Sequence, residues 1–257
     1  MEYANIIYTV DNGIATIKLN RPKALNALNS EINADIMAAI NEVKADPSVR
    51  VLIMTGSERA FAAGADVKEM AEATPRYARE FCGLAIEINN ILESLPIPTI
   101  AAVGGFAFGG GCEMTLAFRV GGSRTTLSFP EVGLGIIPGA NGCARATAIV
   151  GPAKAKQLVM LTEMVPGKQA YDLGLLNWYV EGDAELNAKA VEAKKAFKAA
   201  KKAGAENLDE LKAANKAAEA AAAKAEYDAI YAKAVEVAKT LMTKPACALA
   251  SAKAAIN

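Results

Sequence analysis

The chain has 257 residues, and 53% of them are apolar, which is enough to bury a core in one large domain or two small ones. Its 28 basic and 28 acidic residues cancel, so no overall field favours a nucleic-acid partner or an anionic membrane. No apolar run reaches the roughly 18 residues that span a bilayer, and the start of the chain lacks a signal-peptide pattern, so we expect a soluble cytoplasmic protein with no membrane partner.

Strand-like and helix-like segments alternate along most of the chain. Asn12-Gly13 lies between two apolar runs and predicts a tight turn that joins strands over residues 6–10 and 14–19. A helical period then predicts a helix over residues 30–44. The continuous apolar run over residues 49–56 is typical of a strand that is buried on both faces.

Two more helices are predicted next, one starting at Asp66 and one covering residues 76–95. Pro96 and Pro98 separate the second helix from a strand. The remaining predicted elements are this strand over 99–103, a short helix after 114, extended pieces over 118–120 and 125–129, a loop over 130–142, two helices ending near 163 and a last strand over 175–180.

The composition changes in the C-terminal part. Between Ala193 and Tyr231, 16 of 39 residues are alanine and 8 are lysine, which predicts two helices. Gly204 fits the position after a helix end, and Asn207 with Glu210 fits a capping box that opens a second helix running to about residue 242. We therefore predict a core over residues 1–182 and a helical region over residues 183–257.

A short repeat suggests how this helical region arose. AKAVE occurs at residues 188–192 and again at 232–236, so removing 44 residues would leave one ordinary helix. This favours an inserted hairpin over about residues 193–231, of a kind that is also used in engineered proteins. Chance similarity between two Ala/Lys-rich stretches is the alternative.

The residue types limit the chemistry. The chain contains no histidine, which excludes Ser-His-Asp and Cys-His nucleophiles and histidine-based zinc sites. Its cysteines form no CxxC pair and are expected to be reduced thiols, so we predict no metal site; they are Cys82, Cys112, Cys143 and Cys247. Acid–base chemistry near neutral pH must therefore come from carboxylates, lysine, tyrosine or cysteine.

The sequence FGGGCEM at residues 108–114 follows the predicted strand over residues 99–103 and precedes a helix. The first amides of a helix have no partner within the helix, and glycine lets a ligand approach them, so the turn could receive an anion. Tight strand-to-helix packing explains the glycines equally well. The spacing matches neither GxGxxG nor GxxxxGK[ST], which makes a nucleotide phosphate loop a poor fit.

A second turn of small residues leads into the helix that starts at Asp66. Asp66 and Glu69 form a capping-box pattern, so we interpret Asp66 as an N-cap. The amide of Ala65 would then be free, and two such amides converging on one point would form an oxyanion hole.

Two carboxylates stand out against apolar surroundings. Glu113 follows the glycines, and Glu131 lies in a loop that contains Pro130 and Pro138. Burial raises the pKa of a carboxyl group, and two carboxyl groups that share a site raise each other further. The pair is a candidate general acid and base, although either glutamate alone would ordinarily be a salt-bridge partner.

Together these segments resemble the enoyl-CoA hydratase/isomerase (crotonase) superfamily, in particular its short-chain enoyl-CoA hydratases. The matching motifs follow the order known for the family over about 180 residues. They are NRPKALNAL at 20–28, FAAGADVKEM at 61–70, FGGGCEM at 108–114, FPEVGLGIIPGANG at 129–142 and VGPAKAKQLVMLTEMV with LGLLNWYV between 150 and 180.

The resemblance implies an α/β fold of ββα units wound into a spiral, a C-terminal helical region, and a homotrimer or dimer of trimers. It implies an acyl-CoA thioester substrate, no cofactor apart from the coenzyme A of that substrate, and a place in fatty acid β-oxidation. Glu113 and Glu131 match the two catalytic glutamates that hold the water in the hydratases, and the amides of Ala65 and Gly110 match the oxyanion hole. The implied CoA contacts are Lys23, Ala24, Ala63 and Lys68, and the implied acyl pocket contains Met70, Phe129 and Ile136.

The chain also departs from the family. Two residues are missing between Glu113 and Glu131, a change that could displace one glutamate from the other, and Asn141 and Cys143 replace the commoner glycine and threonine. The chain stops at Asn257, before further helices that are usual in the family. We interpret the chain as a 2-enoyl-CoA hydratase that was engineered by insertion and C-terminal truncation. An isomerase that uses Glu131 alone and a non-catalytic scaffold remain alternatives.

Overall fold

The computed structural model describes residues 2–115, 118–205 and 207–257. Leu116 and Ala117, in the segment between Glu113 and Glu131 that we expect to be shortened, lie outside the described residues. None of the described helices combines the length and the apolar character that crossing a membrane requires.

Two sheets form the body of the protein. The larger sheet has the strand order β1-β2-β3-β5-β7-β10, with β1 antiparallel to β2 and all other neighbours parallel. The smaller sheet has the order β4-β6-β8-β9, and only its β8–β9 pair is antiparallel. The strands are β1 Ile6–Asp11, β2 Ile14–Leu19, β3 Val51–Thr55, β4 Ala60–Ala62, β5 Thr99–Val103, β6 Phe106–Phe108, β7 Phe118–Gly122, β8 Thr126–Ser128, β9 Val165–Pro166 and β10 Trp178–Val180.

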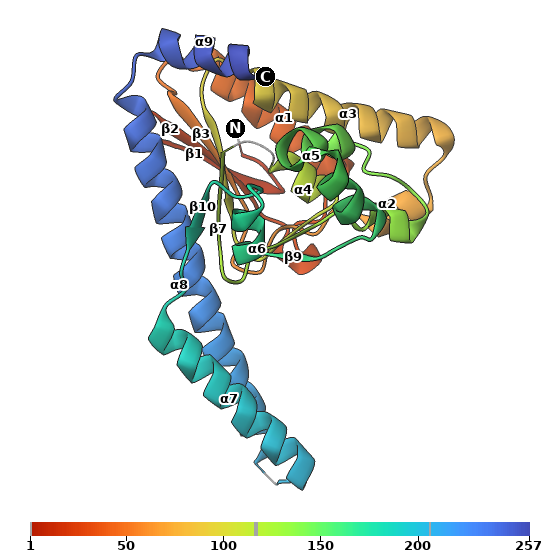
Figure 1. Cartoon of the computed structure of the whole chain (residues 1–257), viewed down its shortest axis with the longest axis vertical. Helices are drawn as coiled ribbons and strands as arrows, with labels where there is room; N and C mark the ends of the chain where they lie inside the picture. Colours follow the sequence, from red (N-terminus) through yellow and green to blue (C-terminus); the bar gives the residue numbers. More distant parts are fainter. Residues whose placement is uncertain (1, 116–117, 206) are drawn as a thin grey trace.

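The chain visits the two sheets in turn. β3, β5 and β7 lie in the larger sheet, and each is followed at once by a short strand of the smaller sheet, β4, β6 and β8, before the chain turns into helix. This is a spiral of ββα units, so the expected α/β fold class is confirmed (Figure 1). Because β4, β6 and β8 are parallel, the turns that lead from them into helix lie at the same edge of the smaller sheet.

Helices surround the sheets. In the described residues they comprise nine α-helices and two 3-10 helices. They are η1 Pro22–Ala24, α1 Ser30–Ala45, α2 Val67–Ala71, α3 Pro75–Ser94, α4 Gly110–Met114, η2 Pro130–Leu134, α5 Gly142–Met160, α6 Gly167–Asp172, α7 Ala184–Ala203, α8 Leu208–Met242 and α9 Ala246–Ile256.

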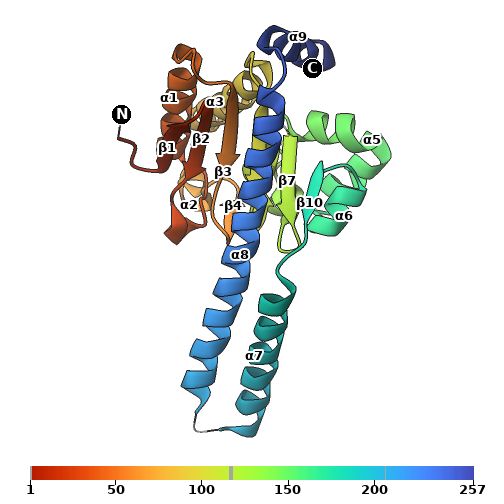
Figure 2. The same ribbon diagram turned by 90° about the vertical axis from the view of Figure 1, so that its left-hand side faces the viewer.

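The larger sheet is buried on both faces, as the apolar run in β3 predicts. Leu52 and Met54 face a core shared with α1, α3 and the smaller sheet. Val51 and Ile53 face the opposite side, where they meet Ile230 of α8. α8 therefore lies across β3, β5 and β7 and covers the outer face of this sheet (Figure 2).

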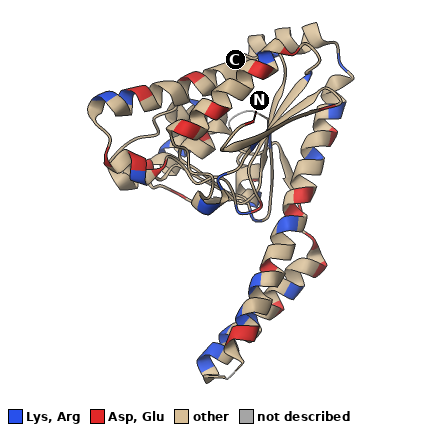
Figure 3. Ribbon diagram, turned by 180° about the vertical axis from the view of Figure 1, so that it is seen from behind, with Lys and Arg blue, Asp and Glu red and all other residues tan. Residues whose placement is uncertain are grey.

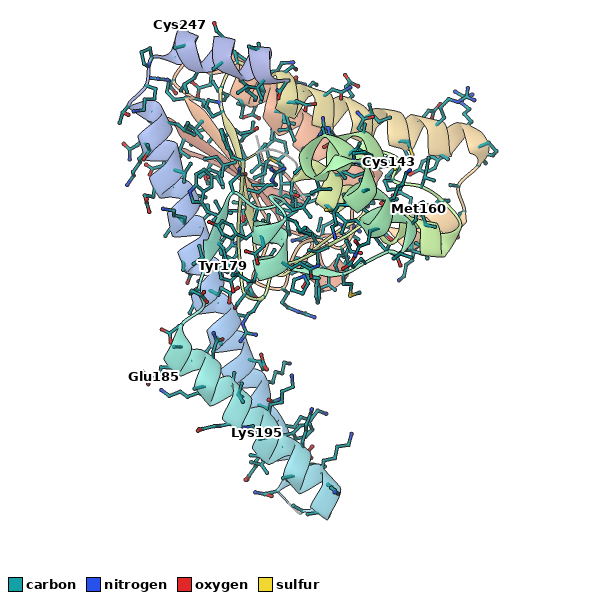
Figure 4. All side chains as sticks on the ribbon, viewed as in Figure 1. Cys143, Met160, Tyr179, Glu185, Lys195 and Cys247 are labelled. Atoms are coloured by element: carbon teal, nitrogen blue, oxygen red, sulfur yellow. The ribbon has the colours of Figure 1, made fainter. Side chains whose placement is uncertain are left out.

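The other half of α8 leaves the body and pairs with α7 as a helical hairpin (Figure 1). Gly204 ends α7 with a φ of 65°, as the sequence predicts for a glycine that follows a helix. Both lysines and acidic residues occur along the projecting part (Figure 3). Lys195 lies far out on it, away from Cys143 on the body (Figure 4).

A buried polar cluster fixes the base of the hairpin. Glu226 of α8 is 2% exposed and accepts hydrogen bonds from the Ser123 hydroxyl and from the Arg124 amide at 2.7 Å. The Arg124 guanidinium donates to Glu219 on α8 at 3.0 Å and to Asn187 on α7 at 2.8 Å. The turn between β7 and β8 thus holds both helices.

Two predicted capping boxes are wrong in part. Asp66 is the N-cap of α2, accepting from the Lys68 amide at 3.2 Å, but Glu69 bonds the Ser30 amide and the Tyr77 hydroxyl instead of the cap. Asn207 precedes α8 but makes no side-chain cap bond. In the first case, a contact between distant segments competes for the carboxylate.

Several element boundaries also differ from the prediction. Two helices were expected before residue 163, and α5 contains both, divided at Gly151, which has a φ of 76°. Of the strand predicted over residues 175–180, only residues 178–180 form a strand, β10, whereas Leu175 and Leu176 pack in the core before it. β4, β6 and β9 were not predicted, since segments of two or three residues show no period.

Candidate active site

The glycine-rich turn joins β6 to α4 and requires its glycines. Gly109 has a φ of 49°, a conformation that L side chains rarely adopt. A Cβ on Gly111 would lie 2.4 Å from the carbonyl oxygen of Ala62, so α4 can approach β4 only without a side chain there. The packing explanation of the glycines is therefore correct, and it leaves the amides at the start of α4 available.

Two amides on neighbouring turns make no hydrogen bond within the described residues. Leu28 pairs with Ala65 in a parallel bridge by bonding the Gly64 carbonyl and the Asp66 amide, so the Ala65 amide points the other way. Gly110 is the first residue of α4, where an amide has no partner within the helix. The two turns touch, since a Cβ on Gly64 would lie 3.2 Å from the carbonyl oxygen of Phe108.

Glu113 projects from α4 into the core and is 2% exposed. Its Oε1 accepts hydrogen bonds from the Ala140 amide at 2.8 Å and the Gly142 amide at 2.7 Å. Burial raises the pKa of Glu113, while these two amides and the positive charge of Arg145 act in the opposite direction. Its Oε1 is therefore anchored, and its environment favours the ionised form more than burial alone would.

Glu131 lies in η2 and is 8% exposed. Its Oε2 has no hydrogen-bond partner among the described residues. Burial raises the pKa of Glu131 to about 7, and the charge of Glu113 contributes to the rise. A carboxyl group with this pKa is partly protonated at neutral pH and can donate a proton.

The two carboxyl groups meet at the glycine turn. A Cβ on Gly109 would lie 2.7 Å from Oε1 of Glu131, and a Cβ on Gly110 would lie 3.8 Å from Oε2 of Glu113. Burial raises the pKa of the Cys143 thiol, and the charges of Glu113 and Glu131 raise it further. The sequence singled out the two glutamates and the two amides, and the fold brings all four to two turns that touch each other.

The four positions expected to contact CoA lie on two segments that are held together. The Ala63 amide donates to the carbonyl of Leu25 at 3.1 Å, and Arg21 forms a salt bridge with Asp66 at 3.2 Å. These bonds connect η1 to the start of α2. Lys23 and Lys68 are exposed on the two segments, and Ala24 and Ala63 are half-buried.

The three positions expected in the acyl pocket differ in burial. Phe129 is 2% exposed, and a Cβ on Gly142 would lie 3.0 Å from its ring. Because Gly142 also contacts Glu113, Phe129 packs directly beside the carboxyl pair. Met70 is half-buried on α2, and Ile136 is 41% exposed in the loop after η2.

Three contributors to this site were not found from the sequence. The amides of Ala140 and Gly142 anchor Glu113, and Arg145 faces it while bonding Glu93 at 2.6 Å. Backbone donors carry no side-chain signal, and an arginine in a helix is ordinarily a surface residue. Within the described residues, no group of three His, Cys, Asp or Glu side chains is placed to hold a metal ion.

The profile of the enoyl-CoA hydratase/isomerase family matches residues 9–244. The chain belongs to this family. It is 41% identical over 189 residues to a crotonyl-CoA hydratase of Syntrophomonas wolfei, covering 72% of this chain and 73% of the relative. It is 40% identical over 190 residues to a short-chain-enoyl-CoA hydratase of Clostridium acetobutylicum, covering 73% of each.

Solved structures agree with this family assignment. An enoyl-CoA hydratase from Bacillus anthracis superposes with a TM-score of 0.78 at 26% identity, covering 98% of this chain and 82% of that one. The family resemblance inferred from the motifs is therefore confirmed, and so is the crotonase fold.

Proposed function

We propose that this enoyl-CoA hydratase/isomerase family member is a hydro-lyase that adds water reversibly to a 2-enoyl-CoA, giving a 3-hydroxyacyl-CoA. The observation that carries the proposal is the pair of buried carboxyl groups, Glu113 and Glu131, at one glycine turn beside two free amides. The names of relatives at 41% and 40% identity support the same reaction. Hydration of this kind places the protein in fatty acid metabolism.

The environments of the two glutamates suggest different roles. Burial raises the pKa of Glu113, but the two backbone hydrogen bonds on Oε1 and the charge of Arg145 oppose that rise, so of the two glutamates Glu113 is assigned as the base that takes a proton from water. The hydroxide adds to the β-carbon. Glu131, with a pKa of about 7 and a free Oε2, donates a proton to the α-carbon. Microscopic reversibility exchanges these roles in dehydration.

The amides of Ala65 and Gly110 stabilise the intermediate. When the C–O bond forms, the π electrons of the double bond move to the thioester oxygen, which becomes an enolate. Two backbone donors preset around that oxygen need no reorganisation, and one such donor is worth about 10²–10³ in rate. Protonation of the α-carbon then returns the electrons and restores the thioester.

The same arrangement provides for the rest of the substrate. Lys23 and Lys68 are exposed cations on the two connected segments and can bind the CoA phosphates, with Ala24 and Ala63 beside them. Met70, Phe129 and Ile136 offer apolar surface to the acyl chain. The reaction exchanges only protons and water, so the coenzyme A of the substrate is the only cofactor-like group that it needs.

We further propose that the protein works in the cytoplasm as a homotrimer or dimer of trimers. Its described cysteines are all free, which suits a reducing compartment. A set of strongly exposed apolar side chains in η2, in the loop after it and around the end of α5 supports assembly, because exposed apolar side chains are typical of interaction surfaces. It comprises Leu134, Ile137, Met160, Leu161 and Met164, each more than 60% exposed. Light scattering should give a mass of three or six chains, and a monomer would contradict the proposal.

The decisive assay follows the loss of conjugated thioester absorbance when crotonyl-CoA is supplied. We expect turnover by the wild type and a loss of about 10²–10⁴ in kcat for Glu113→Gln and for Glu131→Gln, because each removes a proton-transfer group without changing shape. Glu192→Gln, on the exposed face of α7, is the matched control and should match the wild type. Turnover that survives in both site variants would disprove these roles.

Two other outcomes would favour the alternatives. A 3-enoyl-CoA whose double bond shifts without uptake of water, in wild type and Glu113→Gln alike, would indicate an isomerase that uses Glu131 alone. The free Oε2 of Glu131 makes that reaction chemically feasible. Failure to bind any acyl-CoA in calorimetry, with a defined oligomer, would indicate a scaffold.

A further inference from the structure

A cavity of about 520 Å³ lies under α9 and borders α4 through Met114, the residue after Glu113. α3, α5, the C-terminal end of α8 and the start of β7 complete its walls, and α9 lies across this end of the molecule (Figure 1). Neither Glu113 nor Glu131 lines it. Much of the wall is apolar, including Leu92, Met114, Phe118, Ile149 and Leu249, and the volume is in the range of small-molecule sites.

A poorly paired guanidinium lies in this wall. Arg119 of β7 is 7% exposed, its Nε has no hydrogen-bond partner among the described residues, and its Nη2 reaches only the Gly174 carbonyl at 3.4 Å. Burial lowers the pKa of Arg119 to about 10, and among the described residues no carboxylate side chain forms a hydrogen bond or salt bridge with its guanidinium. A buried cation in this state is unfavourable unless an anion joins it.

The other polar groups of the wall strengthen this charge imbalance. Among the lining side chains, Arg119, Arg145 and Lys253 are cationic and only Glu93 is acidic. Glu93 is already bonded to Arg145 at 2.6 Å. Lys253 is bonded to two carbonyl oxygens at 2.9 Å, which do not neutralise its charge.

A second lining group also lacks a partner. Asn89 is 2% exposed, and its Oδ1 accepts no hydrogen bond from the described residues. Its Nδ2 donates to the Ala140 carbonyl at 3.1 Å, and the Ala140 amide bonds Glu113. The cavity is therefore separate from the carboxyl pair but shares a wall with the segment that anchors Glu113.

We propose that this cavity is a second binding site, and that its ligand is a small aliphatic carboxylate. The planar guanidinium of Arg119 matches a carboxylate in a two-bond pairing, which would satisfy its free Nε. The apolar side chains of the wall can pack against the short hydrocarbon chain of such a ligand. Asn89 Oδ1 can accept from a hydroxyl or amide on the ligand, which would then select substituted acids.

Butyrate is the probe for a binding test that needs no enzymatic turnover. Trp178 is the single tryptophan of the chain, and its ring lies 6.2 Å from that of Phe118 in the cavity wall, so its fluorescence reports occupancy. We expect saturable binding of butyrate to the wild type. We expect 1-butanol, which has a similar body without the charge, to bind at least roughly tenfold more weakly.

The variants locate the site. Arg119→Gln should weaken butyrate binding at least roughly tenfold. Arg76→Gln, which alters an arginine whose side chain is 89% exposed on α3, is the matched control and should change nothing. If Arg119→Gln does not fold, Ala148→Phe, which narrows the cavity from the exposed face of α5, should also abolish binding.

Glu131→Gln separates the cavity from the catalytic site, since it should leave butyrate affinity unchanged. Absence of saturable binding to the wild type, equal affinity in Ala148→Phe, or loss of binding only in Glu131→Gln would overturn the proposal. Because binding is read from fluorescence, these results stand whether or not the chain hydrates an enoyl-CoA.

Discussion

The turns of the spiral and the α7–α8 hairpin are built in opposite ways. At the glycine turn, residues from β4, β6, α4, η2 and α5 meet, and side chains, amides and carboxyl groups are all in contact. In α7, the only described residue that is buried is Ala190. The site depends on contacts between distant parts of the sequence, whereas the outer hairpin depends on helix propensity and on pairing of its two helices.

The boundary between these regions lies within α8 and can be tested by stability. Ile230 is 1% exposed against the larger sheet, and Ile230→Ala should lower the free energy of unfolding by about 2–5 kcal/mol. Val191 is 50% exposed on α7, and Val191→Ala should change the free energy of unfolding by less than about 0.5 kcal/mol. Urea unfolding checks both. Equal losses would show that the hairpin is as much part of the core as α8 is.

Burial of Glu131 should make the free energy of unfolding depend on pH, whereas a glutamate on the surface should have little such effect. The pKa of Glu131 has its ordinary value of 4.5 in the unfolded chain, and burial raises it to about 7 in the folded protein. Between these values the folded state holds the extra proton, so stability falls as the pH rises through this window, by roughly 3 kcal/mol for a rise of this size.

Glu131→Gln removes this penalty. The variant should therefore be more stable than the wild type at pH 8 and lose that advantage at pH 4, below both pKa values. Thermal unfolding at the two pH values measures the effect, with Glu192→Gln on the hairpin as the control. A variant that is less stable than the wild type at pH 8 would contradict the assigned burial cost.

Two glycines with a positive φ allow a direct comparison of the regions. A Cβ at Gly109 would strike Glu131, whereas a Cβ at Gly204 meets nothing within 4 Å. Gly204→Ala should lose about 1 kcal/mol of stability from backbone strain, and Gly109→Ala about 1–3 kcal/mol, because its backbone lies in a region that L residues avoid more strongly. Only Gly109→Ala should lose activity, by about 10²-fold, because displacing a catalytic group by about 1 Å has that effect. Unchanged kcat in Gly109→Ala would exclude Glu131 from the reaction.

The smallest effect is expected from removing the hairpin. A Cβ on Gly182 would lie 2.7 Å from Oε2 of Glu226, 44 residues later, and 44 is also the spacing of the AKAVE repeat. We infer that the hairpin is an insertion whose two ends meet. Replacing residues 183–225 by a two-glycine link should leave kcat within about twofold of the wild type. An insoluble or inactive product would show that the hairpin supports the site.

The sequence predicted local features well. The turn at Asn12-Gly13, the helix end at Gly204 and the double-sided burial of β3 all follow from residue types that are close in the chain. The FGGGCEM turn and its glutamate were recognisable because glycines and a carboxylate in an apolar stretch are a local pattern too.

What the sequence did not predict depends on distant contacts. The amides of Ala140 and Gly142 can donate hydrogen bonds to Glu113 only after α4 and α5 pack together. Glu69 likewise accepts a hydrogen bond from the distant Ser30 amide instead of from the N-terminus of its own helix. The strands of the smaller sheet are too short to show a period and are defined by their neighbours. The cavity beside Arg119 likewise exists only in the packed protein.

The most direct test of the proposed chemistry is the pH dependence of kcat/KM for hydration of crotonyl-CoA, which reports ionisations of the free enzyme. Glu131 must be protonated to act as the acid, so kcat/KM should fall as the pH rises through about 7, and the hairpin-excised chain should give the same profile. The absence of hydration, or a rate that stays constant between about pH 5 and pH 9, would contradict the account.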